Sequence, residues 1–225
     1  MIKIPRVKIC GMQTAHDIEI AVNCGADAVG FITDVPVNTP RKICAQTASE
    51  LVKKVPAFVS SVLVIMPENG NEALRLIDEV RPDVVQLHNA INADEIGIIR
   101  NVSDKTIVKV LTVPVGKKRV AKELISQIDF LVDSDLVDAI LLDSGKVDMV
   151  GGTGVTHDWS VSKEIVDSVD VPVILAGGLK PENVREAVEQ VQPFAVDTAS
   201  GVETEGKKDP AKVRRFVRNV RCVNG

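Results

Sequence analysis

Aromatic side chains are scarce in this chain of 225 residues. It has no tyrosine, one tryptophan and five phenylalanines, so aromatic residues make up 3% of the sequence. Proteins that bind single-stranded nucleic acid stack bases on aromatic side chains, and this chain offers little for such a platform. The formal net charge is −4. A mildly acidic chain of this composition argues against nucleic acid as the main partner.

Metal-binding patterns of cysteine and histidine are also lacking. The four cysteines, Cys10, Cys24, Cys44 and Cys222, form no Cys-x-x-Cys pair, and the three histidines lie far apart in the sequence. These spacings do not fit a structural zinc site, so we expect no metal site. Cysteines without a pairing pattern indicate free thiols in a reduced, cytoplasmic protein.

Long hydrophobic runs are absent as well. No apolar stretch approaches the roughly 20 residues that a membrane-spanning helix needs. Residues 1–6 lack the apolar region of a signal peptide. We therefore expect no membrane partner.

The chain does have a regular alternation of short apolar runs and helical stretches, and 45% of its residues are hydrophobic. The apolar runs predict strands at residues 7–10, 28–32, 57–65, 83–88, 106–111, 139–143, 171–176 and 194–197. Helical patterns follow from residue 14, where Thr14-Ala-His-Asp17 resembles a capping box, and over residues 43–54, 71–80, 93–100, 119–135, 160–167, 181–190 and 210–220. Nearly continuous apolar strands are typical of a parallel sheet covered on both faces. Eight such units without a linker predict a single-domain (β/α)8 TIM barrel over residues 1–225, with a doubly wound open sheet as the alternative.

Two glycine turns follow the last two predicted strands. Gly177-Gly178 comes after residues 171–176, and Ser200-Gly201 comes after residues 194–197. In TIM barrels, the last two strand-to-helix loops commonly bind phosphate through backbone N–H groups. Glycine suits this role because a Cβ atom would hold the backbone away from the phosphate oxygens. The sequence therefore predicts a ligand that carries a phosphate group.

Candidate catalytic residues stand where the predicted strands end, since TIM barrels carry their active sites there. Asp143 ends an otherwise apolar strand and is the strongest candidate from the residues alone. Cys10 fits a buried small side chain as well as it fits a base, and Asp197 fits a turn cap as well as a ligand contact. For His88 and Lys109 we favour structural roles, a satisfied histidine at the barrel rim and a lysine in an ion pair.

Short motifs spread over the whole chain resemble phosphoribosylanthranilate isomerase, and they occur in the order of that family. They are Lys8-Ile-Cys-Gly11, Gly25-Ala-Asp-Ala28 with Gly30-Phe31, Gln86-Leu-His88, Leu141-Leu-Asp143, Gly151-Gly-Thr-Gly154 with Asp158-Trp159, Ala176-Gly-Gly-Leu179 with Pro181-Glu-Asn183, and Ser200-Gly-Val-Glu203. Each motif alone is weak, but together at predicted strand ends they are specific.

The resemblance implies an Amadori rearrangement of N-(5-phosphoribosyl)anthranilate in tryptophan biosynthesis. That reaction needs one acid and one base and uses no metal or redox cofactor. The family's acid corresponds to Asp143 and its base to Cys10. An aspartic acid near neutral pH needs a raised pKa, and a cysteine base needs a positive or dipolar neighbour.

The resemblance also implies the substrate contacts. Arg41 would face the anthranilate carboxylate, since a guanidinium suits a planar carboxylate, and Asp197 would touch the substrate's amine or a sugar hydroxyl. The other implied contacts are the phosphate site at Gly177, Gly178, Ser200 and Gly201, and the loop that carries Gly152 and Gly154, which would fold over the substrate.

Other readings are open at this point. Related barrels such as indole-glycerol-phosphate synthase or a ribulose-phosphate epimerase would need a lysine–glutamate pair or metal-binding histidines, and neither is evident. The Amadori isomerase of histidine biosynthesis has an aspartate where Cys10 stands. A binding module for sugar phosphates without activity is the alternative from another class, and the protein could be a monomer or a homodimer.

Overall fold

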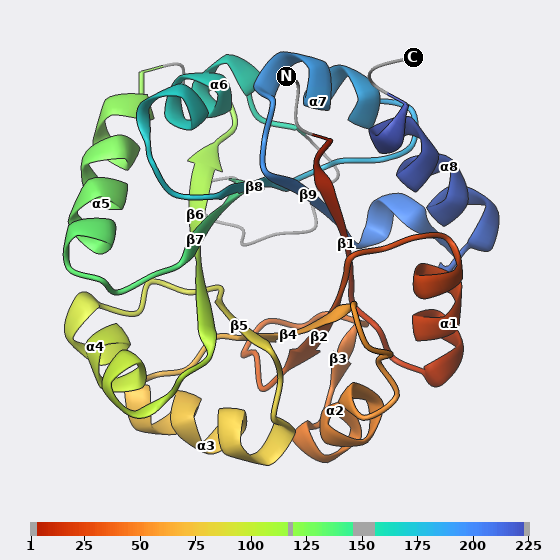
Figure 1. Ribbon diagram of the computed structural model, residues 1–225, viewed down its shortest axis with the longest axis horizontal. Helices are drawn as coiled ribbons and strands as arrows, with labels where there is room; N and C mark the ends of the chain where they lie inside the picture. Colours follow the sequence, from red (N-terminus) through yellow and green to blue (C-terminus); the bar gives the residue numbers. More distant parts are fainter. Residues whose placement is uncertain (1–3, 117–118, 146–155, 223–225) are drawn as a thin grey trace.

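Parallel strands form a closed ring at the centre of the molecule, and helices surround it (Figure 1). The structure is a computed structural model that describes residues 4–116, 119–145 and 156–222. The strands follow the order β1-β2-β4-β5-β6-β7-β8-β9, and β1 pairs with both β2 and β9, which closes the ring. The (β/α)8 barrel prediction is therefore confirmed, and the open-sheet alternative is wrong.

The barrel elements agree with the predicted strands and helices to within a few residues. The strands are β1 (Arg6–Cys10), β2 (Ala28–Thr33), β4 (Ser60–Ile65), β5 (Val84–Leu87), β6 (Thr106–Pro114), β7 (Ala139–Gly145), β8 (Val173–Leu175) and β9 (Ala195–Thr198). The helices are α1 (Ala15–Asn23), α2 (Ala45–Val52), α3 (Gly70–Val80), α4 (Ala93–Val102), α5 (Ala121–Asp133), α6 (Trp159–Ser168), α7 (Val184–Val191) and α8 (Pro210–Arg221). None of the helices in these ranges has the length and apolar character needed to cross a membrane.

Local sequence signals explain where several helices begin. Thr14 and Asp17 form the predicted capping box at the start of α1, each side chain accepting a hydrogen bond from the other residue's backbone N–H. Helix α8 begins with Pro210 after the capping residue Asp209. Helix α7 begins later than predicted because residues 181–183 form a turn, in which Asn183 accepts a hydrogen bond from the Lys180 N–H at 2.8 Å.

The apolar core consists of one large cluster and two small ones, the smallest of which is made of Cys10, Val62 and Val64. The large cluster lies between the strands and the helices, where for example Leu76 of α3, Ile128 of α5 and Phe216 of α8 are fully buried. A smaller cluster, which includes Val108, Val110, Ala139, Leu141 and Ala176, comes from β6, β7 and the end of β8. Burying this apolar surface is the main driving force for the fold.

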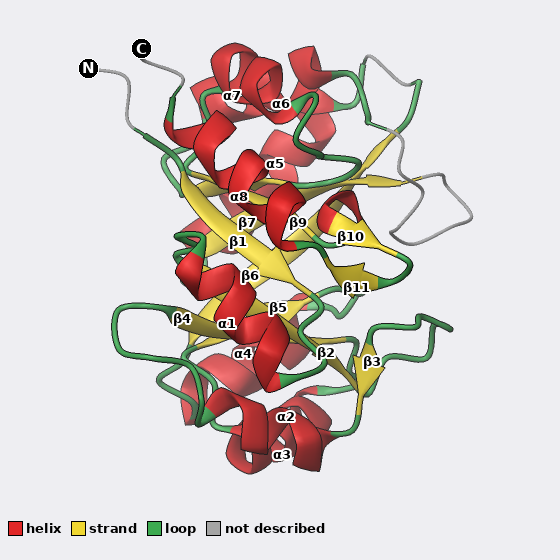
Figure 2. Ribbon diagram, turned by 90° about the vertical axis from the view of Figure 1, so that its right-hand side faces the viewer, coloured by secondary structure: helices red, strands yellow, loops and turns green. Residues whose placement is uncertain are grey.

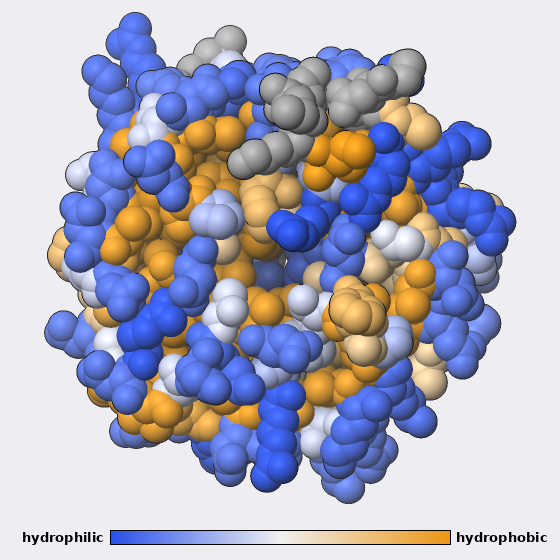
Figure 3. Space-filling model, in the orientation of Figure 1, coloured by the Kyte–Doolittle hydropathy of each residue, from blue (hydrophilic) through white to orange (hydrophobic). Residues whose placement is uncertain are grey.

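Small elements that the sequence did not predict lie at the ends of the barrel strands. They are β3 (Lys42–Ile43), which extends the sheet beside β2, the hairpin of β10 (Glu203–Thr204) and β11 (Lys207–Lys208), and the 3-10 turn η1 (Ser200–Val202). Figure 2 shows β3, β10 and β11 at the end of the barrel toward which the strands point. Figure 3 looks on the opposite end, with hydrophilic side chains along the outer rim and hydrophobic ones between the helices and the barrel.

Candidate active site

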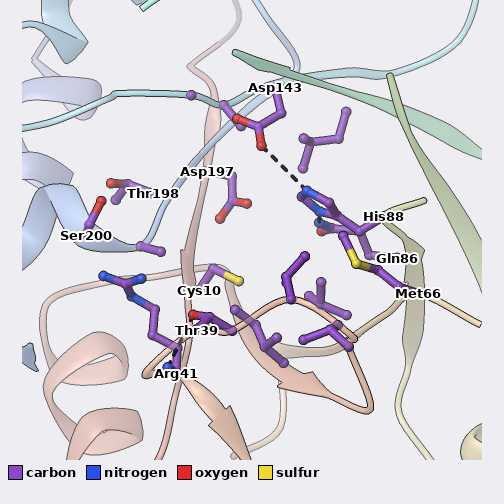
Figure 4. A pocket seen from close by; sticks show the side chains of 18 of the residues that line it. Cys10, Thr39, Arg41, Met66, Gln86, His88, Asp143, Asp197, Thr198 and Ser200 are labelled. Atoms are coloured by element: carbon purple, nitrogen blue, oxygen red, sulfur yellow. Dashed lines mark hydrogen bonds and ion pairs between the residues drawn. The ribbon is translucent and has the colours of Figure 1, made fainter. Parts of the chain in front are cut away.

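A pocket of about 340 Å³ opens where the barrel strands end. Its wall includes Cys10 from β1, Gln86 from β5, Asp143 from β7 and Asp197 from β9, with Arg41 from the loop after β2 (Figure 4). The volume lies in the usual range for small-molecule sites. The predicted candidates Cys10, Asp143, Asp197 and Arg41 are therefore brought together in one cavity.

A buried ion pair lies next to the proposed base. Lys8 and Cys10 are two positions apart on β1, so their side chains point to the same face, the inside of the barrel. The Lys8 Nζ atom lies 2.8 Å from Asp197 Oδ2, and both side chains are less than a tenth exposed. Burial acts to lower the pKa of Lys8, but Asp197 and Cys10 raise it above its ordinary value, so Lys8 keeps its charge.

Cys10 has a positive neighbour, yet burial dominates its titration. Burial raises the pKa of the thiol, and this effect outweighs the opposing influence of Lys8. Cys10 is therefore a thiol at neutral pH. Gly30, its partner on β2, leaves room for the sulfur, because a Cβ atom there would lie 2.7 Å from Cys10 Sγ.

Asp143 has the titration that an acid near neutral pH needs. Burial, together with the nearby Asp197 carboxylate, raises the pKa of Asp143 to about 6. Its Oδ2 atom lies 3.6 Å from His88 Nε2. Because burial lowers the pKa of His88 to about 4, this imidazole is neutral at pH 7 and the contact is not an ion pair there. His88 faces the pocket directly, whereas the sequence indicated only a rim position.

Two acceptor atoms in the pocket wall have no hydrogen-bond partner among the described residues. They are Asp197 Oδ1 and Gln86 Oε1, and both are buried. The other polar atoms of these side chains are engaged, Asp197 Oδ2 with Lys8 and Gln86 Nε2 with His88 Nδ1 at 3.3 Å. Buried polar atoms without a partner are costly unless a ligand satisfies them, so both are available to hydroxyl or amine groups of a substrate.

Arg41 is held by a glutamate that stands in the sequence only as the last residue of a motif, with no role of its own. Glu203 of β10 accepts hydrogen bonds from Arg41 Nε at 2.8 Å and Nη2 at 2.6 Å, and Lys208 Nζ lies 2.6 Å from the same carboxylate. Burial acts to raise the pKa of Glu203, but Arg41 and Lys208 lower it below its ordinary value. The aliphatic part of Arg41 packs on Gly11, where a Cβ atom would lie 2.7 Å from Arg41 Cδ.

The glycine turns lie where the sequence predicts them. Gly177, Gly178 and Ser200 line the pocket. Both Gly177 and Gly178 have positive φ angles, which favour glycine. Gly201 is not part of the described pocket wall, but a Cβ atom there would lie 1.9 Å from the Leu179 carbonyl oxygen. Glycine at that position thus lets the two turns approach each other.

Some sequence-based candidates lie elsewhere. Gly152 and Gly154 fall outside the described residues. The prediction of an ion pair for Lys109 is wrong within the described part of the chain, because its Nζ atom donates to the carbonyl oxygens of Asn89 at 2.6 Å and Val110 at 3.0 Å. Burial lowers the pKa of Lys109 to about 8. In the described ranges, no group of three or more histidine, cysteine or acidic residues could hold a metal ion.

Comparisons with known proteins agree with this geometry. The family model described as N-(5'phosphoribosyl)anthranilate (PRA) isomerase matches residues 7–219. N-(5'-phosphoribosyl)anthranilate isomerase 1 of Methanosarcina mazei is 52% identical, over 97% of this chain and 96% of its own.

Solved structures give the same result. A phosphoribosyl anthranilate isomerase in complex with reduced 1-(o-carboxyphenylamino)-1-deoxyribulose 5-phosphate is 32% identical, with a TM-score of 0.78 over 96% of this chain and 98% of that one. A structure described as monomers generated from the dimeric isomerase of Thermotoga maritima is 31% identical, with a TM-score of 0.77 and the same coverage. The chain therefore belongs to the N-(5'-phosphoribosyl)anthranilate isomerase family, whose members are isomerases of tryptophan biosynthesis.

Proposed function

We propose that Asp143 and Cys10 of this isomerase are the acid and the base that convert N-(5-phosphoribosyl)anthranilate into 1-(2-carboxyphenylamino)-1-deoxyribulose 5-phosphate. The observation that carries this assignment is a carboxyl group with its pKa raised to about 6 in the same pocket as a buried cysteine beside a charged lysine. Acid–base catalysis commonly uses two titratable groups whose environments shift their pKa values apart.

The reaction follows in three steps. Asp143 gives its proton to the ring oxygen of the ribose while the bond between that oxygen and C1 breaks, and the nitrogen lone pair forms a C=N bond. Cys10, as the thiolate, then takes the proton on C2, and that electron pair forms a C1=C2 bond and returns the other pair to nitrogen. The resulting enolamine becomes the ketone when its hydroxyl proton is lost and C1 is protonated. The charge of Lys8 stabilises the thiolate needed for the second step.

Binding is assigned to the remaining candidates. Arg41, oriented by Glu203, binds the anthranilate carboxylate with its donors that Glu203 does not use. Asp197 Oδ1 accepts a hydrogen bond from the substrate's amine or a sugar hydroxyl. The phosphate is assigned to Gly177, Gly178, Ser200 and Gly201, and the loop with Gly152 and Gly154 is proposed to cover the substrate.

The test is to follow the disappearance of freshly generated phosphoribosylanthranilate by its fluorescence, in wild type and in the variants Cys10→Ser and Asp143→Asn. Turnover by wild type that collapses in each variant, with binding of a product analogue retained, would support both assignments. Asp129→Asn, which changes an exposed aspartate of α5, serves as the control for loss of one charge. Wild-type-like turnover by either variant would remove that residue from its role, and analogue binding without turnover by wild type would favour a binding module.

We also propose the domain organisation, the cellular location and the oligomeric state. Residues 1–225 would form one domain, and the protein would act in the cytoplasm as a monomer or a homodimer. The described pocket wall takes residues from β1, β5, β7 and β9 and from the turn after β8, on all sides of one barrel, which supports a site complete in one chain. Sedimentation of the active enzyme would decide between the two oligomeric states, and a specific activity independent of dilution would support a site complete in one chain.

A further inference from the structure

A buried polar cluster lies beside Asp143 and plays no part in the acid–base scheme. It consists of Ser144 at the end of β7, His157 just before α6, Ser162 within α6, and the carbonyl of Gly177 after β8. The three side chains are at most 3% exposed. None of the three belongs to the pocket wall, so they do not contact a ligand there.

The cluster is a continuous chain of hydrogen bonds. The Ser144 oxygen accepts from the backbone N–H of His157 at 3.0 Å and lies 2.7 Å from His157 Nδ1. It donates to the Gly177 carbonyl oxygen at 3.3 Å. On the other side of the ring, His157 Nε2 lies 2.5 Å from the Ser162 oxygen. The histidine thus joins three consecutive barrel segments.

Counting protons selects one tautomer. A serine oxygen has one proton and two lone pairs. When Ser144 gives its proton to Gly177, it can only accept from the imidazole, so Nδ1 carries the ring proton. Nε2 then accepts a hydrogen bond from the Ser162 hydroxyl. With this tautomer, every contact from Ser162 through His157 and Ser144 to Gly177 is a hydrogen bond. The opposite tautomer would take the Ser144 proton and leave the Gly177 carbonyl without this partner.

We propose that His157, held with its proton on Nδ1, is a positioning residue that fixes the glycine turn of the phosphate site through Ser144. In a trans peptide the C=O and N–H groups point in opposite directions. A Gly177 carbonyl drawn toward Ser144 therefore turns the Gly178 N–H away from Ser144. The next carbonyl, that of Gly178, is likewise held, by Asn183 Nδ2 at 3.1 Å. The inference rests on the proposed phosphate site at this turn.

The same serine lies next to the acid. The Ser144 backbone N–H faces the Asp143 carboxylate and acts to lower the pKa of that carboxyl group. Ser144 and Gly177 are in close contact, since a Cβ atom on Gly177 would lie 2.2 Å from the Ser144 oxygen. A change at His157 is thus expected to act on phosphate binding first and on the rate second, because both sites share Ser144.

The first test reads the tautomer directly. With only three histidines in the chain, long-range 15N–1H spectra at about pH 7 can be assigned with His16→Gln and His88→Gln variants. His157 is neutral there because burial lowers its pKa to about 4. We expect the proton of His157 on Nδ1. A proton on Nε2 would overturn the proposal.

The second test uses three substitutions of His157, with ribose 5-phosphate as the probe in titration calorimetry. His157→Phe keeps a ring and removes both contacts, His157→Gln can reach only toward Ser162, and His157→Asn can still donate toward Ser144. Since loss of one hydrogen bond costs a factor of roughly 3–10 in affinity, we expect that weakening in the first two variants and values within about twofold of wild type in His157→Asn. Ser162→Ala, which removes only the far contact, is the matched control.

The readouts separate this proposal from the proposed function. KM and kcat of the isomerase reaction are measured beside the ribose 5-phosphate affinity and the melting temperature of each variant. A folded His157→Phe variant with wild-type affinity and KM would overturn the positioning role. Wild type without isomerase activity would instead overturn the proposed function, while the tautomer and the ribose 5-phosphate affinities would still decide the role of His157.

Discussion

The proposed acid, Asp143, has an ionised form that the folded protein disfavours. Its pKa rises from an ordinary 3.8 to about 6 because the folded barrel disfavours the ionised carboxylate. For an acid with a raised pKa, the folded state binds the proton more tightly than the unfolded state does. The stability of the protein should therefore fall as the pH rises from about 4 to about 6, and the full cost should be present at neutral pH.

Asp143→Asn should consequently stabilise the protein at neutral pH while it abolishes turnover. A shift of about two pKa units corresponds to on the order of 2–3 kcal/mol, or roughly 4–12 °C in melting temperature for a chain of this size. Thermal unfolding of the variant and wild type at about pH 7.5 and pH 4 measures this difference in melting temperature. The higher melting temperature of the variant should vanish at about pH 4. Asp129→Asn should show no such gain, and an equal gain for both variants would contradict the linkage.

The acid and the base together predict a pH profile. Below about pH 6 both Asp143 and Cys10 are protonated and no base is present, so kcat/KM should rise through that value. It should fall only in the alkaline range, because burial raises the pKa of Cys10. Between these two pH limits, Asp143 and Cys10 together hold one proton. The active form has that proton on Asp143 and a thiolate at Cys10.

The rise of kcat/KM near pH 6, which is the acid limb of the profile, depends on residues next to Asp143. Asp197 raises the pKa of Asp143, whereas the Ser144 N–H and Lys8 lower it. Asp197→Asn should therefore shift the acid limb of kcat/KM below pH 6, whatever it does to the maximal rate. An acid limb that stays in place would show that Asp143 is not the group that titrates there.

At the scale of elements, the short hairpin of β10 and β11 supports Arg41, which we propose to bind the substrate. Glu203 stands on β10 and Lys208 on β11. The Glu203 carboxylate accepts hydrogen bonds from Lys208 and from two nitrogens of Arg41. A partly buried and oriented guanidinium loses less conformational entropy when it binds a carboxylate. We therefore expect the hairpin to act through Arg41 on substrate affinity.

Substitutions at this contact should change KM more than kcat. Arg41→Ala should raise KM about tenfold or more, because the proposed contact exists in both the ground state and the transition state. Glu203→Gln should raise KM by a smaller factor, since it loosens the arginine without removing it. Initial rates over a range of substrate concentrations measure both. Arg75→Ala, on the exposed face of α3, is the control, and an unchanged KM for Arg41→Ala would point to another anchor for the carboxylate.

Elements of different length differ in how well the sequence predicts them. The eight barrel strands and their helices have long apolar patterns, and they were predicted to within a few residues. The two-residue strands β3, β10 and β11 were not, because their residues are mostly charged and their pairing is decided by the strands and loops around them. The sequence predicted a turn at Ser200-Gly201, but its 3-10 form over Ser200–Val202 depends on close packing against Leu179.

The same limit applies to the site. Strand-end positions predicted Cys10, Asp143 and Asp197, and the alternation of side chains along β1 could also have shown that Lys8 shares the inner face with Cys10. The contact between Arg41 and Glu203 joins residues 162 positions apart, and no local signal predicts it. Gln86 and His88 were quoted as a motif, but only the closed barrel shows that they face Asp143.

At the scale of the whole molecule, the barrel depends on contacts that join the first and last segments of the chain. Asp27, just before β2, accepts hydrogen bonds from the Val7 N–H of β1 at 2.7 Å and from Arg221 of α8 at 2.6 Å. Helices α1 and α8 lie side by side next to β1 (Figure 1). These contacts close the ring on the side away from α6.

Asp27→Ala should therefore destabilise the entire barrel. Loss of a partly exposed charged hydrogen-bond acceptor costs about 2 kcal/mol, which corresponds to a fall of roughly 4–8 °C in melting temperature. The single tryptophan, Trp159, lies at the start of α6 on the other side of the ring (Figure 1). Because one closed barrel should unfold as one unit, far-ultraviolet circular dichroism and Trp159 fluorescence should report the same lowered transition. Asp104→Ala, at a side chain that is 93% exposed, should leave both unchanged. A fall seen by circular dichroism but not by Trp159 would show that the two sides of the barrel unfold independently.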